Sequence, residues 1–245
     1  MKHYISIGVD YQQDFKEGGA LAVEGGQKAV EAYLRLIEHK VPSDYSADEN
    51  SASPEDKTTH YKSFIKEAIL TKDSHPYNHC SFKFINPDGQ WPWHCVEHTE
   101  GAAICDPIIK TLAMNGIPYG VVGKGQKPNE ENYTAFRFVF VNDHMYTYSL
   151  APDFNPVGNV LDFLRDPEDV EENFNEIIIS GIAGDYCVLE TVKAMIDMDP
   201  IIYLPGVASI DGGKALNDYI EEHHLRIMDE NFNIVRSTSG VEVSE

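Results

Sequence analysis

The sequence lacks a hydrophobic segment long enough to cross a membrane. Its longest apolar runs span about six residues, whereas a transmembrane helix needs roughly 20. The first ten residues, MKHYISIGVD, reach Asp10 before an apolar stretch of the secretory-signal type develops. These two absences predict a soluble protein of the cytoplasm that does not interact with membranes.

Basic residues and cysteines are also scarce. The chain has 19 Lys and Arg residues against 40 Asp and Glu residues, a formal net charge of −21. Because this charge repels phosphate backbones and anionic lipids, we expect no nucleic-acid partner. Four cysteines allow two disulfides, but 42% of the 245 residues are hydrophobic, which is enough for a core without them. We therefore expect reduced thiols at Cys80, Cys95, Cys105 and Cys187.

Short apolar runs alternate with helical patterns along the chain. The runs predict strands at residues 4–9, 65–70, 119–122, 176–183, 201–204 and 225–228. The helical patterns lie at residues 27–36, 108–114, 157–164, 190–196 and 215–224. This alternation predicts an α/β fold, a mostly parallel sheet with helices on both faces. We expect one domain over residues 1–245, with surface insertions near 41–63 and 137–154, because no linker or repeat divides the chain.

Polar residues follow four of the predicted strands. Asp10, Asp73, Lys124 and the turn 183–187 each stand where a strand ends. Since sites in open α/β sheets form at the carboxyl ends of the strands, these positions predict a site at that edge.

Each of these residues also has an ordinary structural interpretation. A cysteine such as Cys187 is usually a small buried hydrophobe, but at the start of a helix it can be a nucleophile, and position alone leaves the two comparable. Asp10 could cap a turn and Lys124 could be an exposed loop residue. Together they could instead supply a proton acceptor and a stabilising ammonium to a cysteine nucleophile.

Histidines and aromatic residues gather near the same strand ends. In an extended segment Asp73 and His75 point the same way, and with His94 they would form a metal site, with His79 as a possible fourth ligand. The alternative is a set of surface histidines, which we favour for His98. The neighbouring aromatic residues could belong to the core or wall a flat substrate: Phe15, Trp91, Trp93 and Tyr186.

Five segments together resemble the nicotinamidases of the isochorismatase-like cysteine hydrolase family. They are VDYQQDFKEGGALAV at 9–23, KDSHPYNHCSF at 72–82, WPWHCVEHTEGA at 91–102, KGQKPNEENYTAF at 124–136 and GIAGDYCV at 181–188. Their order matches the family and they span most of the chain. The sequence departs from the family at Ser74, where Trp is common, and at residues 98–100, where Gly-Thr-Pro is common.

The resemblance implies a role for each matched residue. The family triad falls on Asp10, Lys124 and Cys187, and its metal ligands fall on Asp73, His75 and His94. A cis peptide before Ala183 would aim the N–H groups of Ala183 and Cys187 at an oxyanion. The aromatic pocket would consist of Phe15, Trp91 and Tyr186.

The implied reaction is metal-dependent hydrolysis of nicotinamide to nicotinate and ammonia through a thioester, in NAD salvage. The resemblance implies one divalent ion, Zn²⁺ first and Fe²⁺ or Mn²⁺ next, and leaves a homo-oligomer open. Two alternatives are a related amidohydrolase acting on a carbamoyl or ureido substrate and a ligand-binding protein without activity.

Overall fold

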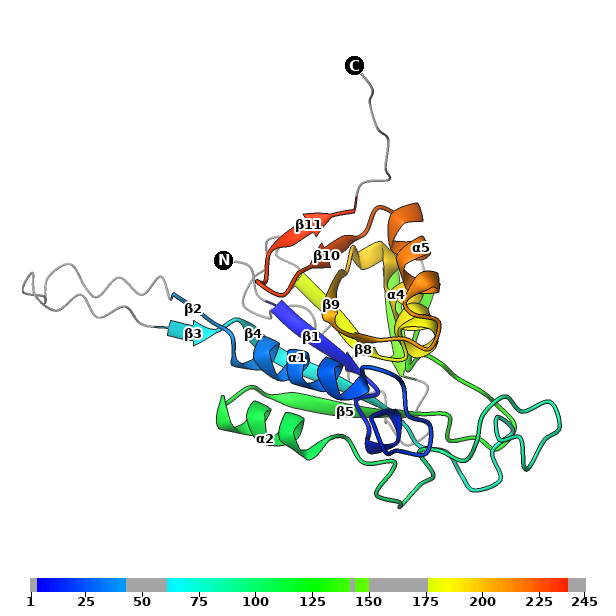
Figure 1. The fold of residues 1–245 in the computed structure, drawn as a ribbon. Coiled ribbons are helices and arrows are strands. Elements are labelled where there is room, and N and C mark those ends of the chain that lie inside the picture. The colour runs from blue at the N-terminus through cyan, green and yellow to red at the C-terminus, as the bar shows by residue number, and fades with distance from the viewer. Residues whose placement is uncertain (1–3, 43–60, 142–143, 150–175, 238–245) are drawn as a thin grey trace, which may run out of the picture.

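The computed structural model describes residues 4–42, 61–141, 144–149 and 176–237, and it is built on a seven-stranded sheet (Figure 1). The strand order is β11-β10-β9-β8-β1-β4-β5. The strands are β1 (Tyr4–Val9), β4 (Ile65–Asp73), β5 (Tyr119–Lys124), β8 (Glu176–Ile182), β9 (Ile201–Ala208), β10 (Arg226–Met228) and β11 (Ile234–Arg236). All neighbours pair in parallel except β11, which runs antiparallel to β10.

Helices cover both faces of this sheet. One face packs against α1 (Gly26–Glu38) and α2 (Asp106–Met114), and the other against α4 (Leu189–Ala194) and α5 (Lys214–Glu222). The predicted α/β class is therefore confirmed. In the part of the chain that the structure describes, no helix has the length and apolar character needed to cross a membrane.

The predicted elements differ from the observed ones mainly in their bounds. β9 is longer than the predicted strand at 201–204. The predicted helix at 190–196 corresponds to α4, which is preceded by a π-helical turn (Gly184–Val188) and followed by the 3-10 turn Ile196–Met198. The predicted helix at 157–164 and the segment 43–60 lie outside the described residues. The sequence patterns missed β11, the 3-10 turn Gln13–Phe15 and two hairpins, β2 (Lys40–Pro42) with β3 (Tyr61–Ser63) and β6 (Phe136–Val141) with β7 (His144–Ser149).

Alternation along the central strands supplies both hydrophobic cores. In β1, Ile5, Ile7 and Val9 face α4 and α5, while in β8, Ile178 and Ile182 face α1. Because both faces are covered, these strands are mostly apolar on both sides, which is why the sequence pattern predicted them well.

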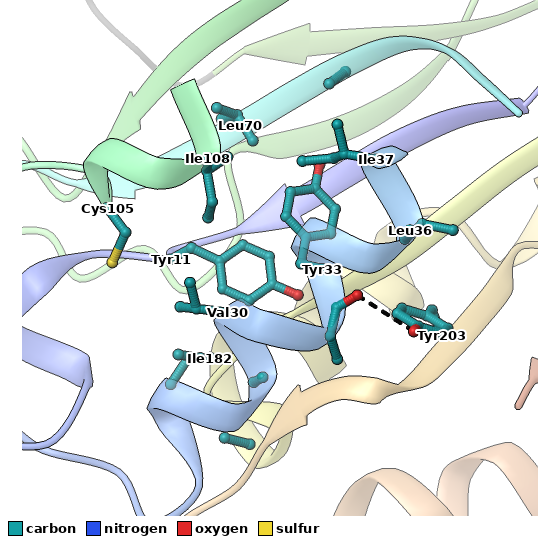
Figure 2. Close-up of a cluster of buried hydrophobic side chains, with 14 of the residues drawn as sticks. Tyr11, Val30, Tyr33, Leu36, Ile37, Leu70, Cys105, Ile108, Ile182 and Tyr203 are labelled. Atoms are coloured by element: carbon teal, nitrogen blue, oxygen red, sulfur yellow. Dashed lines mark hydrogen bonds between the residues drawn. The ribbon is translucent and has the colours of Figure 1, made fainter. Parts of the chain in front are cut away.

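Three buried tyrosines, Tyr11, Tyr33 and Tyr203, belong to the core between α1 and the sheet (Figure 2). The Tyr33 ring stacks on Tyr11 at 4.6 Å between centroids, and its hydroxyl lies 2.9 Å from Ser6 Oγ. A Cβ at Gly8 would lie 2.9 Å from the Tyr33 hydroxyl and 2.8 Å from Leu70. A glycine at this position therefore allows α1 to pack closely on β1.

Candidate active site

Four neighbouring strands end in the same place and bring the predicted catalytic residues together. Asp10 follows β1, Asp73 ends β4, Lys124 ends β5, and Cys187 lies in the π-helical turn after β8. The Lys124 ammonium lies at their centre. Its Nζ is 2.8 Å from Asp10 Oδ2, 2.5 Å from Asp73 Oδ1 and 3.3 Å from Cys187 Sγ.

Burial controls the charges in this cluster. Lys124 is 1% exposed and Asp10 is fully buried. Burial opposes the charged lysine, but Asp10 and Asp73 raise the pKa of Lys124 well above its usual value. Burial likewise opposes ionisation of Asp73, but Lys124 and the nearby histidines hold the pKa of this carboxyl well below its usual range. Lys124 and Asp73 therefore form a buried ion pair.

Asp10 and Cys187 differ from that pair. Burial raises the pKa of Asp10, with a partly offsetting effect of Lys124, and the Thr71 hydroxyl donates to Asp10 Oδ1 at 2.7 Å. Burial also raises the pKa of Cys187 well above its usual value. The Lys124 ammonium lowers this pKa, whereas the Asp10 and Asp73 carboxylates raise it further. The resting sulfur is therefore a thiol. Such a thiol needs a base before it can act as a nucleophile.

The turn that carries Cys187 has the predicted backbone feature. The peptide bond between Ile182 and Ala183 is cis. The Ala183 carbonyl accepts hydrogen bonds from the N–H groups of Tyr186 and Val188 at 3.2 and 3.0 Å, and the Asp185 carboxylate accepts the N–H of Ile210 at 2.9 Å. These bonds define the position of the Cys187 side chain. The use of the Ala183 and Cys187 N–H groups for an oxyanion stays a prediction.

The predicted metal ligands lie directly beside the cluster. Asp73 Oδ2 is 3.6 Å from His75 Nε2 and 3.9 Å from His94 Nε2. His75 Nδ1 donates to the Gly125 carbonyl and His94 Nδ1 donates to the Pro92 carbonyl, both at 2.9 Å. Because a carbonyl only accepts, each imidazole in its neutral form has its Nε2 lone pair available for a ligand. The donor set of one carboxylate oxygen and two imidazole nitrogens fits a divalent ion such as Zn²⁺.

His79 lies next to this trio but is used differently. Its Nε2 donates to the Glu130 carbonyl at 3.0 Å and its Nδ1 accepts from the Ser81 hydroxyl at 2.7 Å. Burial lowers its pKa to about 4, so the ring is neutral. The ring stacks on His75 at 4.1 Å between centroids. Both nitrogens are occupied by protein groups, so in this conformation His79 supports His75 rather than offering a lone pair.

The predicted aromatic residues divide into two groups. Phe15 packs on His94 with ring centroids 5.7 Å apart, and Trp91 meets Tyr186 edge-on at 5.0 Å. Trp93, in contrast, is 50% exposed and contacts Phe84.

Sequence reasoning missed several neighbours of the site. The Tyr133 ring is 5.4 Å from Tyr186, and its hydroxyl accepts from Trp91 Nε1 at 3.4 Å. Phe82 packs at 5.6 Å against both His75 and His94. Both residues fall inside the family-like segments at 124–136 and 72–82, which was the available signal.

The remaining cysteines are less suited to react. All four cysteines are free, as the sequence predicted. Cys95 and Cys105 are fully buried, and burial raises the pKa of both thiols. Neither has a cation in hydrogen-bonding contact comparable to the one that Lys124 makes with Cys187 among the described residues.

Comparison with known proteins places the chain in a family. No protein-family model matches it. A nicotinamidase of Escherichia coli (strain K12) is 32% identical over 197 residues, which cover 75% of this chain and 72% of that protein. The fold is similar to the crystal structure of PnC1 from L. infantum in complex with nicotinate, with a TM-score of 0.64, 19% identity and 94% of each chain covered. It is also similar to the pyrazinamidase of Pyrococcus horikoshii in complex with zinc, with a TM-score of 0.56, 22% identity, and 93% of this chain and 99% of that chain covered. The sequence relationship, together with this fold, shows that the chain belongs to the nicotinamidase family of isochorismatase-like hydrolases.

Proposed function

We propose that this protein hydrolyses the carboxamide of nicotinamide to nicotinate and ammonia, in NAD salvage. The observation that carries the proposal is the double contact of Asp73. One carboxylate oxygen of Asp73 binds the Lys124 ammonium beside Cys187, and the other lies beside the Nε2 atoms of His75 and His94. A nucleophile and a metal site are thus separated by a single side chain. A small ring substrate with a carboxamide on one side and a ring nitrogen on the other matches that spacing.

The first chemical step uses the thiol and its base. The raised pKa of Asp10 suits it to accept a proton, and Cys187 needs a base because its own pKa is raised. Asp10 removes the thiol proton while the sulfur attacks the carboxamide carbon. The N–H groups of Ala183 and Cys187 stabilise the oxyanion. Asp10 then returns the proton to the amide nitrogen, the C–N bond breaks, and ammonia leaves a thioester on Cys187.

The second step restores the enzyme. A water molecule attacks the thioester carbon and gives one proton to Asp10. The C–S bond breaks, the proton returns from Asp10 to the Cys187 sulfur, and the product leaves as nicotinate, with the second proton of the water released to solvent. Throughout both steps the Lys124 ammonium, within 3.3 Å of Cys187 Sγ, stabilises the negative charge that moves among sulfur, carboxylate and oxyanion.

Asp73, His75 and His94 would hold one divalent ion. Zn²⁺ is the first candidate, with Fe²⁺ and Mn²⁺ next, because imidazole and carboxylate ligands suit all three. When bound, the ion supplies a Lewis-acid contact for the substrate ring nitrogen. The protein residues do the rest of the orientation. Phe15, Trp91 and Tyr186 would wall the flat ring, and Tyr133 would complete the wall.

The location of the reaction is also a proposal. All four cysteines are free although the chain has enough of them for two disulfides. This cysteine usage supports a reducing compartment, and we propose the cytoplasm.

Ammonia release tests the proposed function. The purified protein, loaded with Zn²⁺, is incubated in parallel with nicotinamide and with a panel of carbamoyl and ureido compounds, and ammonia is measured with time. We expect release from nicotinamide with saturable kinetics and none above background from the panel. Release from the panel alone would move the chain to the carbamoyl or ureido amidohydrolases. The absence of release from every compound would support a binding protein without activity.

A further inference from the structure

Gln12 is a buried polar residue that the proposed chemistry does not use. It lies two residues after Asp10, in the loop between β1 and the 3-10 turn Gln13–Phe15, and it is 0% exposed. A neutral amide in such a place must find partners for two donors and an oxygen acceptor, or burial costs free energy.

The partners of Gln12 belong mainly to one residue, the predicted metal ligand Asp73. The Asp73 N–H donates to Gln12 Oε1 at 2.8 Å, and Gln12 Nε2 donates to the Asp73 carbonyl at 2.8 Å. Gln12 Nε2 also donates to the Ala102 carbonyl at 3.0 Å. The side-chain amide therefore satisfies both backbone groups of Asp73, as a neighbouring strand would.

These hydrogen bonds extend the pairing of β1 and β4 beyond the point where their backbone hydrogen bonds end. β1 and β4 pair as far as Gly8 and Leu70, and the Asp10 N–H still donates to the Thr71 carbonyl at 3.2 Å. At Asp10 the backbone turns with a φ of 51°, so the main chain leaves the sheet. The Gln12 side chain reaches back and continues the pairing at Asp73. It thereby ties the strand end that carries Asp10 to the strand end that carries Asp73.

We propose that Gln12 is a positioning residue that holds Asp73 where it can contact both Lys124 and the metal site. This inference rests on the proposed metal site. Asp73 must keep Oδ1 on Lys124 and Oδ2 beside His75 and His94. A shift of its main chain would move both oxygens, and ligands of a metal site are sensitive to the groups that orient them. Only a glutamine side chain combines this length with a donor and an acceptor. Glutamate has the same shape but would place a second oxygen against two carbonyls.

Metal affinity measured without substrate tests the inference. Gln12→Glu and Gln12→Met are compared with wild type and with the neighbouring control Gln13→Glu, each as metal-free folded protein. The dissociation constant for Zn²⁺ is determined by competition with a chromophoric chelator, and the unfolding midpoint is recorded for each protein. We expect both Gln12 variants to bind Zn²⁺ roughly 10- to 100-fold more weakly than wild type, and the control to match wild type. Gln12→Glu keeps the shape of the side chain and the oxygen that accepts the Asp73 N–H. It therefore provides the test even if Gln12→Met does not fold.

The outcomes separate this inference from the proposed function. A Gln12→Glu protein that melts earlier but binds Zn²⁺ as tightly as wild type would make Gln12 a structural residue only and overturn the inference. A wild-type protein that binds no Zn²⁺ would overturn the inference together with the metal site. A wild type that binds Zn²⁺ but releases no ammonia from nicotinamide would refute the proposed function alone, and the affinity ratio would still decide the role of Gln12.

Discussion

Replacement of Lys124 by methionine should destabilise the protein far more than the loss of one ion pair at a surface. Methionine has a similar length and fills the same space, but it removes the ammonium that lies within 3 Å of two buried carboxylates, Asp10 and Asp73. Removing one partner from a buried ion pair typically costs about 3–5 kcal/mol, because a charge is left without compensation. His75, 3.6 Å from Asp73 Oδ2, can take up a proton and offset part of this cost, so Asp10 bears the larger share. Since domains are stable by only about 5–15 kcal/mol, Lys124→Met should remove a large fraction of that stability.

Urea unfolding of metal-free protein in excess EDTA measures the effect. Lys193→Met is the matched control, because Lys193 pairs with Glu190 at 2.7 Å but both side chains are 41% exposed. An exposed pair contributes roughly 0–1 kcal/mol, so this variant should remain close to wild type. The double variant Asp10→Asn/Lys124→Met should recover part of the loss, because it also removes one of the two carboxylates left without an ammonium. A loss below about 1 kcal/mol in Lys124→Met, similar to the surface control, would refute the electrostatic account of the cluster.

Three further predictions follow from the site. Cys187→Ala should fold and bind metal yet lower kcat/KM for nicotinamide by several orders of magnitude, while Cys105→Ala retains most activity; more than trace turnover in Cys187→Ala would contradict a covalent mechanism. His94→Ala should sharply reduce metal content from roughly one ion per chain in elemental analysis, and unchanged content would remove His94 from the ligand set. Benzamide, which has no ring nitrogen, should show a kcat/KM at least about 100-fold below that of nicotinamide, with pyrazinamide much closer to nicotinamide. Similar efficiency on benzamide and nicotinamide would mean that the ring nitrogen is not recognised.

The sequence alone determined the class of fold and the position of the site along the chain. The run at 176–182 is mostly apolar because both faces of β8 are buried, and the polar residues at 10, 73 and 124 mark the ends of their strands. In a parallel sheet all carboxyl ends lie on one edge, so these residues could be assigned to one site without knowledge of the strand order. The cis peptide before Ala183 followed only from the family resemblance, because a local pattern does not specify it.

The tertiary structure decided which residues touch and in what chemical state. The order β8-β1-β4-β5 brings these strand ends together, so that the Lys124 ammonium at the end of β5 contacts both Asp73 and Asp10. No local pattern contains that order, because it depends on which strands pair. Burial raises the pKa of Cys187, so its thiol needs a base, which the position of a cysteine at the start of a helix could not show.

The partners of the predicted ligands likewise required the fold. Two backbone carbonyls, from Gly125 and Pro92, orient the rings of His75 and His94, and the Gly125 carbonyl comes from a segment 50 residues away along the chain. Trp93 contacts Phe84 and Tyr133 contacts Tyr186 for a similar reason, since the sequence gives the residue type but not the direction of the loop that carries it. Hydrophobic periodicity records which face of an element is buried, while the site depends on contacts between segments far apart in the sequence, which only the folded chain brings together.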